Sequence, residues 1–133
     1  MEIINKKCAF EDERGEIIDI LENEAIEYVT FISSRKGAIR GNHYHNDSIQ
    51  YAFVLKGSLK VITQIPGSEV ESKIARSGDL IFTPQREKHV LIALEDSEFL
   101  VLTRGPRGGK NYETDTFRLT GSESLLAKGE GIL

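Results

Sequence analysis

The strongest constraint on this chain is the grouping of its apolar residues into short runs rich in Val, Ile, Phe and Tyr. Eight such runs have the length and residue types of a β-strand. They span residues 16–20, 26–33, 50–55, 59–65, 80–83, 90–94, 99–103 and 114–119. Gly57, Pro66-Gly67 and Gly105-Pro106 lie between runs, where glycine and proline supply the φ angles of sharp reversals. This spacing predicts an all-β barrel or sandwich.

Helical patterns are scarce in the sequence. No stretch of a dozen residues carries apolar positions at helical spacing with caps at both ends, so an α/β fold would lack its crossover helices. The length of 133 residues suits one hydrophobic core. We therefore expect a single domain over residues 1–133, with its core at about 12–119. Residues 120–133 are expected to form a short helix and a loose tail.

Charge and cysteine content limit the partners and the location. The formal net charge of −4 argues against binding to nucleic acid or to an anionic membrane, which require a basic surface. No long apolar run follows the first residues, so we expect neither a signal peptide nor a membrane anchor, and a cytoplasmic location. Cys8 is the one cysteine and cannot form an internal disulfide, so we assign it no role.

The three histidines of the chain carry its strongest chemical signal. His43 and His45 are separated by one residue in a strand-like segment, which places both imidazoles on one face. The turn at Asn46-Asp47-Ser48 then lets Gln50, at the start of the next strand, swing beside them. His89 begins a distant strand, and a sheet closed into a barrel would return it to this pair.

Two groups of residues resemble the motifs of the cupin superfamily. The first is a glycine, His-x-His, a glutamate and a glycine, and it is matched by Gly37, His43, His45, Gln50 and Gly57. The second is matched by Gly78, Pro84 and His89. The sequence departs from the pattern where Gln50 replaces the glutamate, Arg86 a usual glycine, and Ala93 a common asparagine. The resemblance implies the cupin double-stranded β-helix, a jelly-roll barrel.

The four converging side chains predict a metal site. His43, His45 and His89 offer neutral nitrogens and Gln50 an amide oxygen, which suit a divalent transition metal such as Zn, Ni, Mn or Fe. Because no carboxylate neutralises the cation, we expect weaker metal affinity or stronger attraction for an anionic ligand. Two alternatives stay open. The imidazoles could simply pack inside a barrel, or His43 and His45 could move protons without a metal.

The segment from Arg40 to His45, followed by Gln50, also resembles the sugar-nucleotide ketoisomerases and deoxysugar epimerases among cupins. That resemblance implies that His43 and His45 are the acid/base pair. The residues it implies for substrate binding are Arg40 and Arg14, for diphosphate or sugar, and Tyr44 and Tyr51, as positioning phenols. An ordinary β-turn equally explains residues 12–15 around Arg14.

The residues and the resemblance together predict a metal-binding isomerase or epimerase that acts on a sugar or sugar nucleotide. The alternatives are a dioxygenase that uses a redox-active metal, and a barrel that binds a small ligand without catalysis. A homodimer is expected, because small cupins often dimerise and an unpaired edge strand at residues 3–10 would favour a partner.

Overall fold

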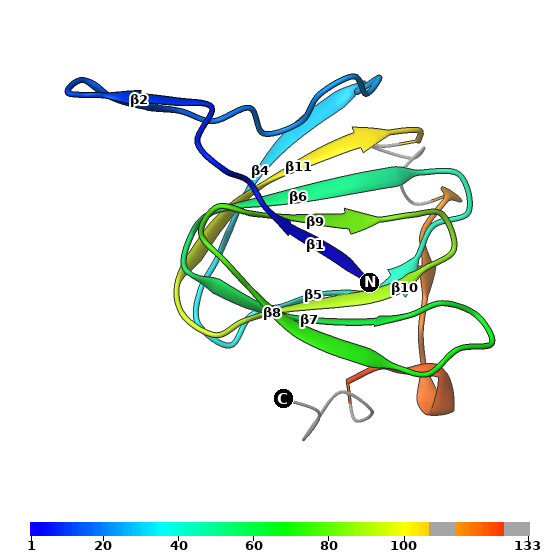
Figure 1. Ribbon diagram of the computed structural model, residues 1–133. Coiled ribbons are helices and arrows are strands. Elements are labelled where there is room, and N and C mark those ends of the chain that lie inside the picture. Colours follow the sequence, from blue (N-terminus) through cyan, green and yellow to red (C-terminus); the bar gives the residue numbers. More distant parts are fainter. Residues whose placement is uncertain (107–113, 127–133) are drawn as a thin grey trace.

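The computed structural model describes residues 1–106 and 114–126, which form two five-stranded antiparallel sheets and a separate hairpin (Figure 1). The first sheet has the order β1 (Glu2–Asn5), β9 (Asp79–Thr83), β6 (Ile49–Lys56), β11 (Ser97–Arg104), β4 (Tyr28–Ser34). The second has the order β12 (Phe117–Arg118), β5 (Ile39–Tyr44), β10 (Lys88–Ala93), β7 (Ser58–Gln64), β8 (Glu71–Arg76). The hairpin joins β2 (Phe10–Asp12) and β3 (Gly15–Ile17). The predicted all-β jelly roll is confirmed.

The interior between the two sheets holds the main hydrophobic core. Alternate residues of each strand face inward, as the period of two along a strand requires. The fully or nearly buried members are Ala52, Val54, Leu59, Val61, Ala75, Ile81, Ala93, Phe99 and Val101. Burying a side chain of this kind contributes about 1.5–3 kcal/mol. The same inward-facing positions continue along the strands to one end of the barrel, where they are occupied by polar residues.

A second, smaller cluster lies on the outer face of the β5–β10–β7–β8 sheet. Ile62 and Val90 belong to its strands, and Leu119 and Leu125 belong to the C-terminal segment that covers them. This segment contains β12 and the 3₁₀ turn η1 (Gly121–Glu123). The C-terminal residues up to 126 are therefore packed against the barrel. Of the short helix and loose tail predicted over residues 120–133, the described part contains the 3₁₀ turn η1, and residues 127–133 lie outside the described residues.

Two predicted strands differ from the observed ones, and one observed strand was not predicted. The predicted strand 16–20 is limited to β3, and the predicted strand 114–119 to β12, because the side chain of Asp115 is used to cap a turn. Strand β8 was missed, since its sequence, ESKIAR, carries more charged than apolar residues. It is nevertheless held to β7 along its whole length. Backbone pairing to a neighbour compensates here for a weak local pattern.

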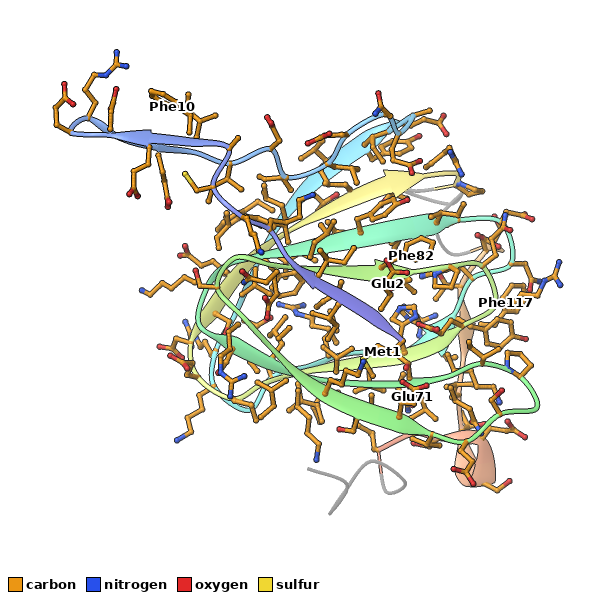
Figure 2. All side chains as sticks on the ribbon, viewed as in Figure 1. Met1, Glu2, Phe10, Glu71, Phe82 and Phe117 are labelled. Atoms are coloured by element: carbon orange, nitrogen blue, oxygen red, sulfur yellow. The ribbon has the colours of Figure 1, made fainter. Side chains whose placement is uncertain are left out.

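The predicted edge strand over residues 3–10 is divided in two. Residues 2–5 form β1, which pairs with β9 of the same chain and leaves only its other side at the sheet edge. Residues from Phe10 onward form the β2–β3 hairpin, which projects from the barrel (Figures 1 and 2). Among the described residues, no helix is long and apolar enough to cross a membrane.

Candidate functional site

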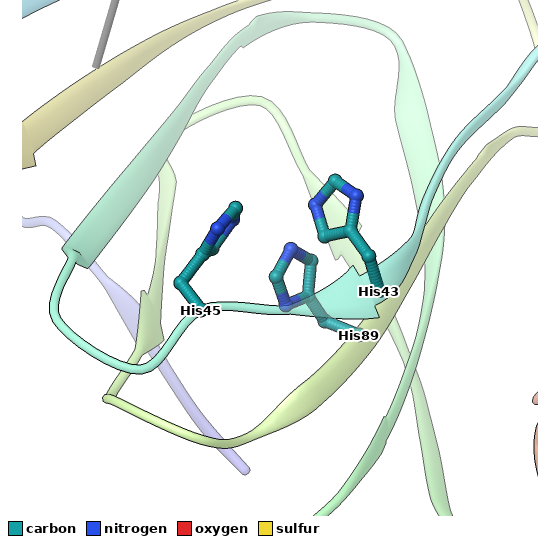
Figure 3. Close-up of side chains that lie close together, drawn as sticks. All are labelled: His43, His45 and His89. Carbon is teal, nitrogen blue, oxygen red and sulfur yellow. The ribbon is translucent and has the colours of Figure 1, made fainter. Parts of the chain in front are cut away.

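The three histidines meet inside one end of the barrel (Figure 3). Ring centroids are 4.7 Å apart for His43 and His45, 4.6 Å for His43 and His89, and 5.4 Å for His45 and His89. One ligand nitrogen from each ring lies within 4.8 Å of the others. The predicted convergence of the three imidazoles is therefore present.

A β-bulge in β5 helps to bring them together. His43 pairs with His89 and Gly41 pairs with Val90, so Asn42 is an extra residue between them, with a left-handed φ of 62°. The side chain of Asn42 donates to the carbonyl of Leu119 and accepts from the backbone N–H of Leu125. The C-terminal segment therefore holds the bulge that aligns His43 with His89. Bulges of this kind re-aim a side chain within a sheet.

Two of the imidazole rings are fixed by backbone carbonyls. His45 donates from Nδ1 to the carbonyl of Asp115 at 2.8 Å, and His89 donates from Nδ1 to the carbonyl of Glu87 at 3.1 Å. A carbonyl only accepts, so Nδ1 carries the proton and Nε2 keeps its lone pair in both rings. Metal-binding histidines are commonly held in this way by a carbonyl on the second nitrogen.

Burial keeps His89 neutral. It is 6% exposed, and this burial is the main reason why its pKa falls to about 4. The hydrogen bond to the Glu87 carbonyl acts to raise the pKa of His89, and electrostatic repulsion from His45 acts to lower it. At neutral pH the Nε2 lone pair of His89 is therefore available to a ligand.

Gln50 approaches from the opposite wall of the barrel. It is buried on β6 and is in register with Thr83 of β9 and Thr103 of β11, on the same face as the core residues Ala52 and Val54. This agrees with its predicted inward orientation at the histidine end. Its contribution as a metal ligand stays a prediction.

The side chains of the four residues predicted to bind substrate make their contacts away from the three histidines. Arg40 bridges β5 to β4 by donating to Ser34 Oγ at 3.1 Å and to the Ser33 carbonyl at 2.8 Å. Arg14 is at the tip of the β2–β3 hairpin, where it pairs with Asp12 at 2.6 Å. Tyr44 and Tyr51 alternate with inward-facing neighbours and stack on Phe117 and Phe82, on the outer faces of the sheets. Their roles in substrate binding stay predictions.

Comparison with known proteins identifies the family. A profile of the family described as Cupin matches residues 19–122, which is more than half of the chain. The chain is a cupin. This confirms the resemblance carried by the two histidine motifs.

Solved structures with the same fold include enzymes of sugar-nucleotide metabolism. The cupin is similar to a double mutant of the QdtA 3,4-ketoisomerase from Thermoanaerobacterium thermosaccharolyticum in complex with TDP, with 25% identity and a TM-score of 0.73 over 88% of this chain and 86% of the other. It shares its fold with dTDP-4-dehydrorhamnose 3,5-epimerase from Sulfolobus tokodaii, with 19% identity and a TM-score of 0.75 over 91% and 77% of the two chains.

A curated protein also matches part of the cupin. The pectin degradation protein KdgF of Dickeya dadantii is 33% identical over 72 residues, which are 54% of this chain. The match spans 61% of that relative's length. These comparisons give a cupin with close structural similarity to sugar-nucleotide ketoisomerases and epimerases.

Sequence reasoning missed one residue that supports the site. The buried carboxylate of Asp115 accepts hydrogen bonds from the backbone N–H groups of Asn46, Asp47 and Ser48 and from Ser48 Oγ. Burial acts to raise the pKa of Asp115, but these hydrogen bonds outweigh it and the pKa is lowered. Asp115 therefore fixes the turn after His45 as well as the ring of His45. No local signal identifies it, because it lies about 70 residues further along the chain.

A second missed residue is Glu87, a buried carboxyl two residues before His89. Its Oε1 atom has no hydrogen-bond partner among the described residues, and burial raises its pKa. A buried polar atom in this state would gain from a partner that a ligand or water could supply. No local pattern predicts this burial, because Glu87 follows Pro84, Gln85 and Arg86 in a turn.

Proposed function

We propose that this cupin is a metal-dependent enzyme that isomerises or epimerises a carbohydrate bearing a carbonyl group. The observation that carries this proposal is the group of three imidazoles with ligand nitrogens within 4.8 Å of one another. The family membership alone would not carry it, since one fold serves many functions.

The donor set fits a divalent transition metal. His43, His45 and His89 would hold it, and the carboxamide of Gln50 would add an oxygen ligand from the opposite wall. The Nδ1 hydrogen bonds of His45 and His89 support this assignment, because they turn the Nε2 lone pairs away from the backbone. When bound, such a metal supplies a Lewis acid that polarises a carbonyl oxygen.

The same lone pairs cannot serve as ligands and as proton acceptors at once. A catalytic base works best with a pKa near the working pH, whereas the pKa of His89 is about 4. This difference favours a ligand role for His89. The two roles predicted for His43 and His45 therefore compete, and we assign them first to the metal.

The lining of the barrel beside the histidines suits a polar ligand. Thr63, Thr83 and Thr103 are buried at this end, next to Gln50 in the sheet register or to His89. The hydroxyl of Thr103 has no hydrogen-bond partner among the described residues. A hydroxyl-rich ligand would satisfy such a group, and this supports a carbohydrate. The similarity to ketoisomerases and to a pectin degradation protein supports the same class.

Elemental analysis of the purified protein, with His89→Ala beside it, tests the metal assignment. We expect near-stoichiometric metal in the native protein and a sharp loss in His89→Ala. Ile62→Val, in the outer cluster, is the matched control for a modest loss of packing and should keep its metal. Equal metal content in His89→Ala and the native protein would contradict the assignment.

A metal-free sugar-nucleotide ketoisomerase is the second candidate, favoured by the 25% identity to QdtA over most of the chain. His43 and His45 would then move a proton between neighbouring sugar carbons. Incubation with TDP-4-keto-6-deoxyglucose in deuterated water, before and after chelation, separates the two candidates. Deuterium incorporation that survives chelation would favour the metal-free reaction, and incorporation restored only by metal would favour our first proposal.

We further propose that the protein is a homodimer. Val29 and Phe31 on the outer face of β4 are 65% and 57% exposed, and Phe10 and Ile17 of the projecting hairpin are 53% and 58% exposed. A two-stranded hairpin is marginally stable alone in water, and contact with a second subunit would bury its apolar residues.

A further inference from the structure

A cavity of about 720 Å³ lies on the outer side of the second sheet, at the histidine end of the barrel. Tyr44 contributes to its wall, whereas its neighbours His43 and His45 point into the barrel. Strand β5 therefore separates this outer cavity from the histidines. Phe117, which is labelled in Figure 2, stacks on Tyr44 at the same wall. The volume is in the range of small-molecule sites.

The outer cavity has a positive lining in a protein with a net charge of −4. Arg86, Lys88 and Arg118 contribute to its wall, and Glu123 is the acidic residue beside them. Glu123 pairs with Lys88 at 2.7 Å and neutralises one of the three cations. The charged residues of the lining sum to a net charge of +2. A concave surface of this kind attracts anions, and guanidinium groups are shaped to bind phosphate oxygens.

Arg86 stands in a backbone conformation that its side chain disfavours. Its φ is 67°, in the left-handed region where a side chain crowds the backbone and glycine is favoured. Its backbone N–H donates to the His45 carbonyl at 2.6 Å, which ties it to the rim of the barrel. Among the described residues, no hydrogen bond or ion pair engages its exposed guanidinium. Strained residues of this kind are concentrated at ligand-binding sites.

The aromatic wall gives the outer cavity a second type of contact. The rings of Tyr44 and Phe117 are stacked, with centroids 5.2 Å apart and planes 19° from parallel. Phe117 is 37% exposed, so part of its ring faces outward. A flat ring attached to a phosphate group could pack on this surface while its phosphates meet the cations.

We infer that the outer cavity is a binding site for a diphosphate group, with Arg86 as its principal anchor and Arg118 and Lys88 beside it. The diphosphate could be free or part of a nucleoside diphosphate, in which case the base would pack on Phe117. This site lies on the other side of β5 from the histidines. It does not depend on the proposed metal or on the proposed reaction.

Calorimetric titration with inorganic pyrophosphate, TDP and thymidine tests this inference. We expect saturable binding of pyrophosphate and TDP that weakens at high salt, and much weaker binding of thymidine. Tighter binding of TDP than of pyrophosphate, lost in Phe117→Leu, would identify the nucleoside diphosphate as the ligand. Equal binding of the two would identify the diphosphate alone. Thymidine bound as tightly as TDP would overturn the inference.

Arg86→Gly provides the sharpest variant. It removes the guanidinium but keeps the backbone N–H and relieves the left-handed strain, so pyrophosphate affinity should fall at least about tenfold while the melting temperature stays equal or rises. Asn23→Gly, also left-handed with a φ of 56°, controls for the backbone effect, and Arg35→Ala at the far end of the barrel controls for charge. Unchanged affinity in Arg86→Gly would refute the site.

Pyrophosphate binding by the metal-chelated native protein and by His89→Ala shows whether the anion binds in the outer cavity or at the histidines. Both should bind pyrophosphate as the untreated protein does, because the outer cavity contains neither the metal ligands nor their neighbours on the inner face. Loss of binding in both would move the anion to the histidines and overturn this inference, whereas the metal proposal would be unaffected.

Discussion

Removal of the Asp115 carboxylate should loosen the histidine end of the barrel by a predictable amount. Four groups donate to it, and two of them, the backbone N–H and the hydroxyl of Ser48, belong to a residue that is 2% exposed. In Asp115→Ala, Asn46 and Asp47 can turn to water, and the Ser48 hydroxyl can still donate to the Pro106 carbonyl at 2.9 Å. The backbone N–H of Ser48 is then the stranded donor. A stranded donor costs about 1–3 kcal/mol, and the loss of a charged acceptor for the other three donors adds to this cost, so we expect a total loss of about 3 kcal/mol.

Thermal and urea unfolding measure this loss. For a domain of this size, about 3 kcal/mol corresponds to a fall of about 10 °C in melting temperature. Ser48→Ala is the graded control, since it removes one donor and strands none, and it should cost about 1 kcal/mol. A loss below about 1 kcal/mol in Asp115→Ala would refute the argument that this carboxylate holds the turn.

The loss of stability in Asp115→Ala should also depend on pH. The folded pKa of Asp115 is lower than its usual value of 3.8, so its stabilisation is fully present above that value and is lost as the pH falls through the folded pKa. The difference in stability between Asp115→Ala and the native protein should therefore shrink in strong acid. The proposed metal site gives an independent readout, because the turn follows His45, and a loosened His45 should weaken affinity for the proposed metal about 10-fold to 100-fold.

Three further predictions follow from single groups. In chelated protein, the free energy of unfolding should rise by up to about 3 kcal/mol between pH 4 and 6.5. The pKa of His89 is about 4 in the folded protein and 6.5 in the unfolded chain, so the unfolded chain binds more protons in this window. Urea titrations should show this slope flattened in His89→Gln, and an unchanged slope would count against a buried neutral His89. Gly41→Ala should cost about 2 kcal/mol, because φ is 89° and a Cβ would lie 2.8 Å from the His89 carbonyl oxygen; a melting curve that matches the native one would contradict this. Phe31→Glu should turn the expected dimer into a monomer in light scattering, with Lys36→Glu, in the exposed turn after β4, as the control for added charge.

The sequence by itself determined the fold class and the central residues of the site. Short β-branched runs bury their apolar faces in sheets, and the two-residue period of a strand places His43 and His45 on one face. The resemblance to the second cupin motif added His89 to this pair. Their convergence could be predicted because a barrel must return a late strand to an early one.

Only the tertiary structure decided what supports these residues and which of their neighbours join them. The alternation of side chains along a strand places Tyr44 and Tyr51 on the outer faces of the sheets. The hydrogen bonds of Arg40 to β4 hold its side chain against that strand. Asp115 reaches the turn after His45 from a distant part of the chain. These outcomes depend on register, on a bulge and on contacts between residues far apart in sequence. Local patterns carry no information about such contacts, because many residues of the same polarity could have made them.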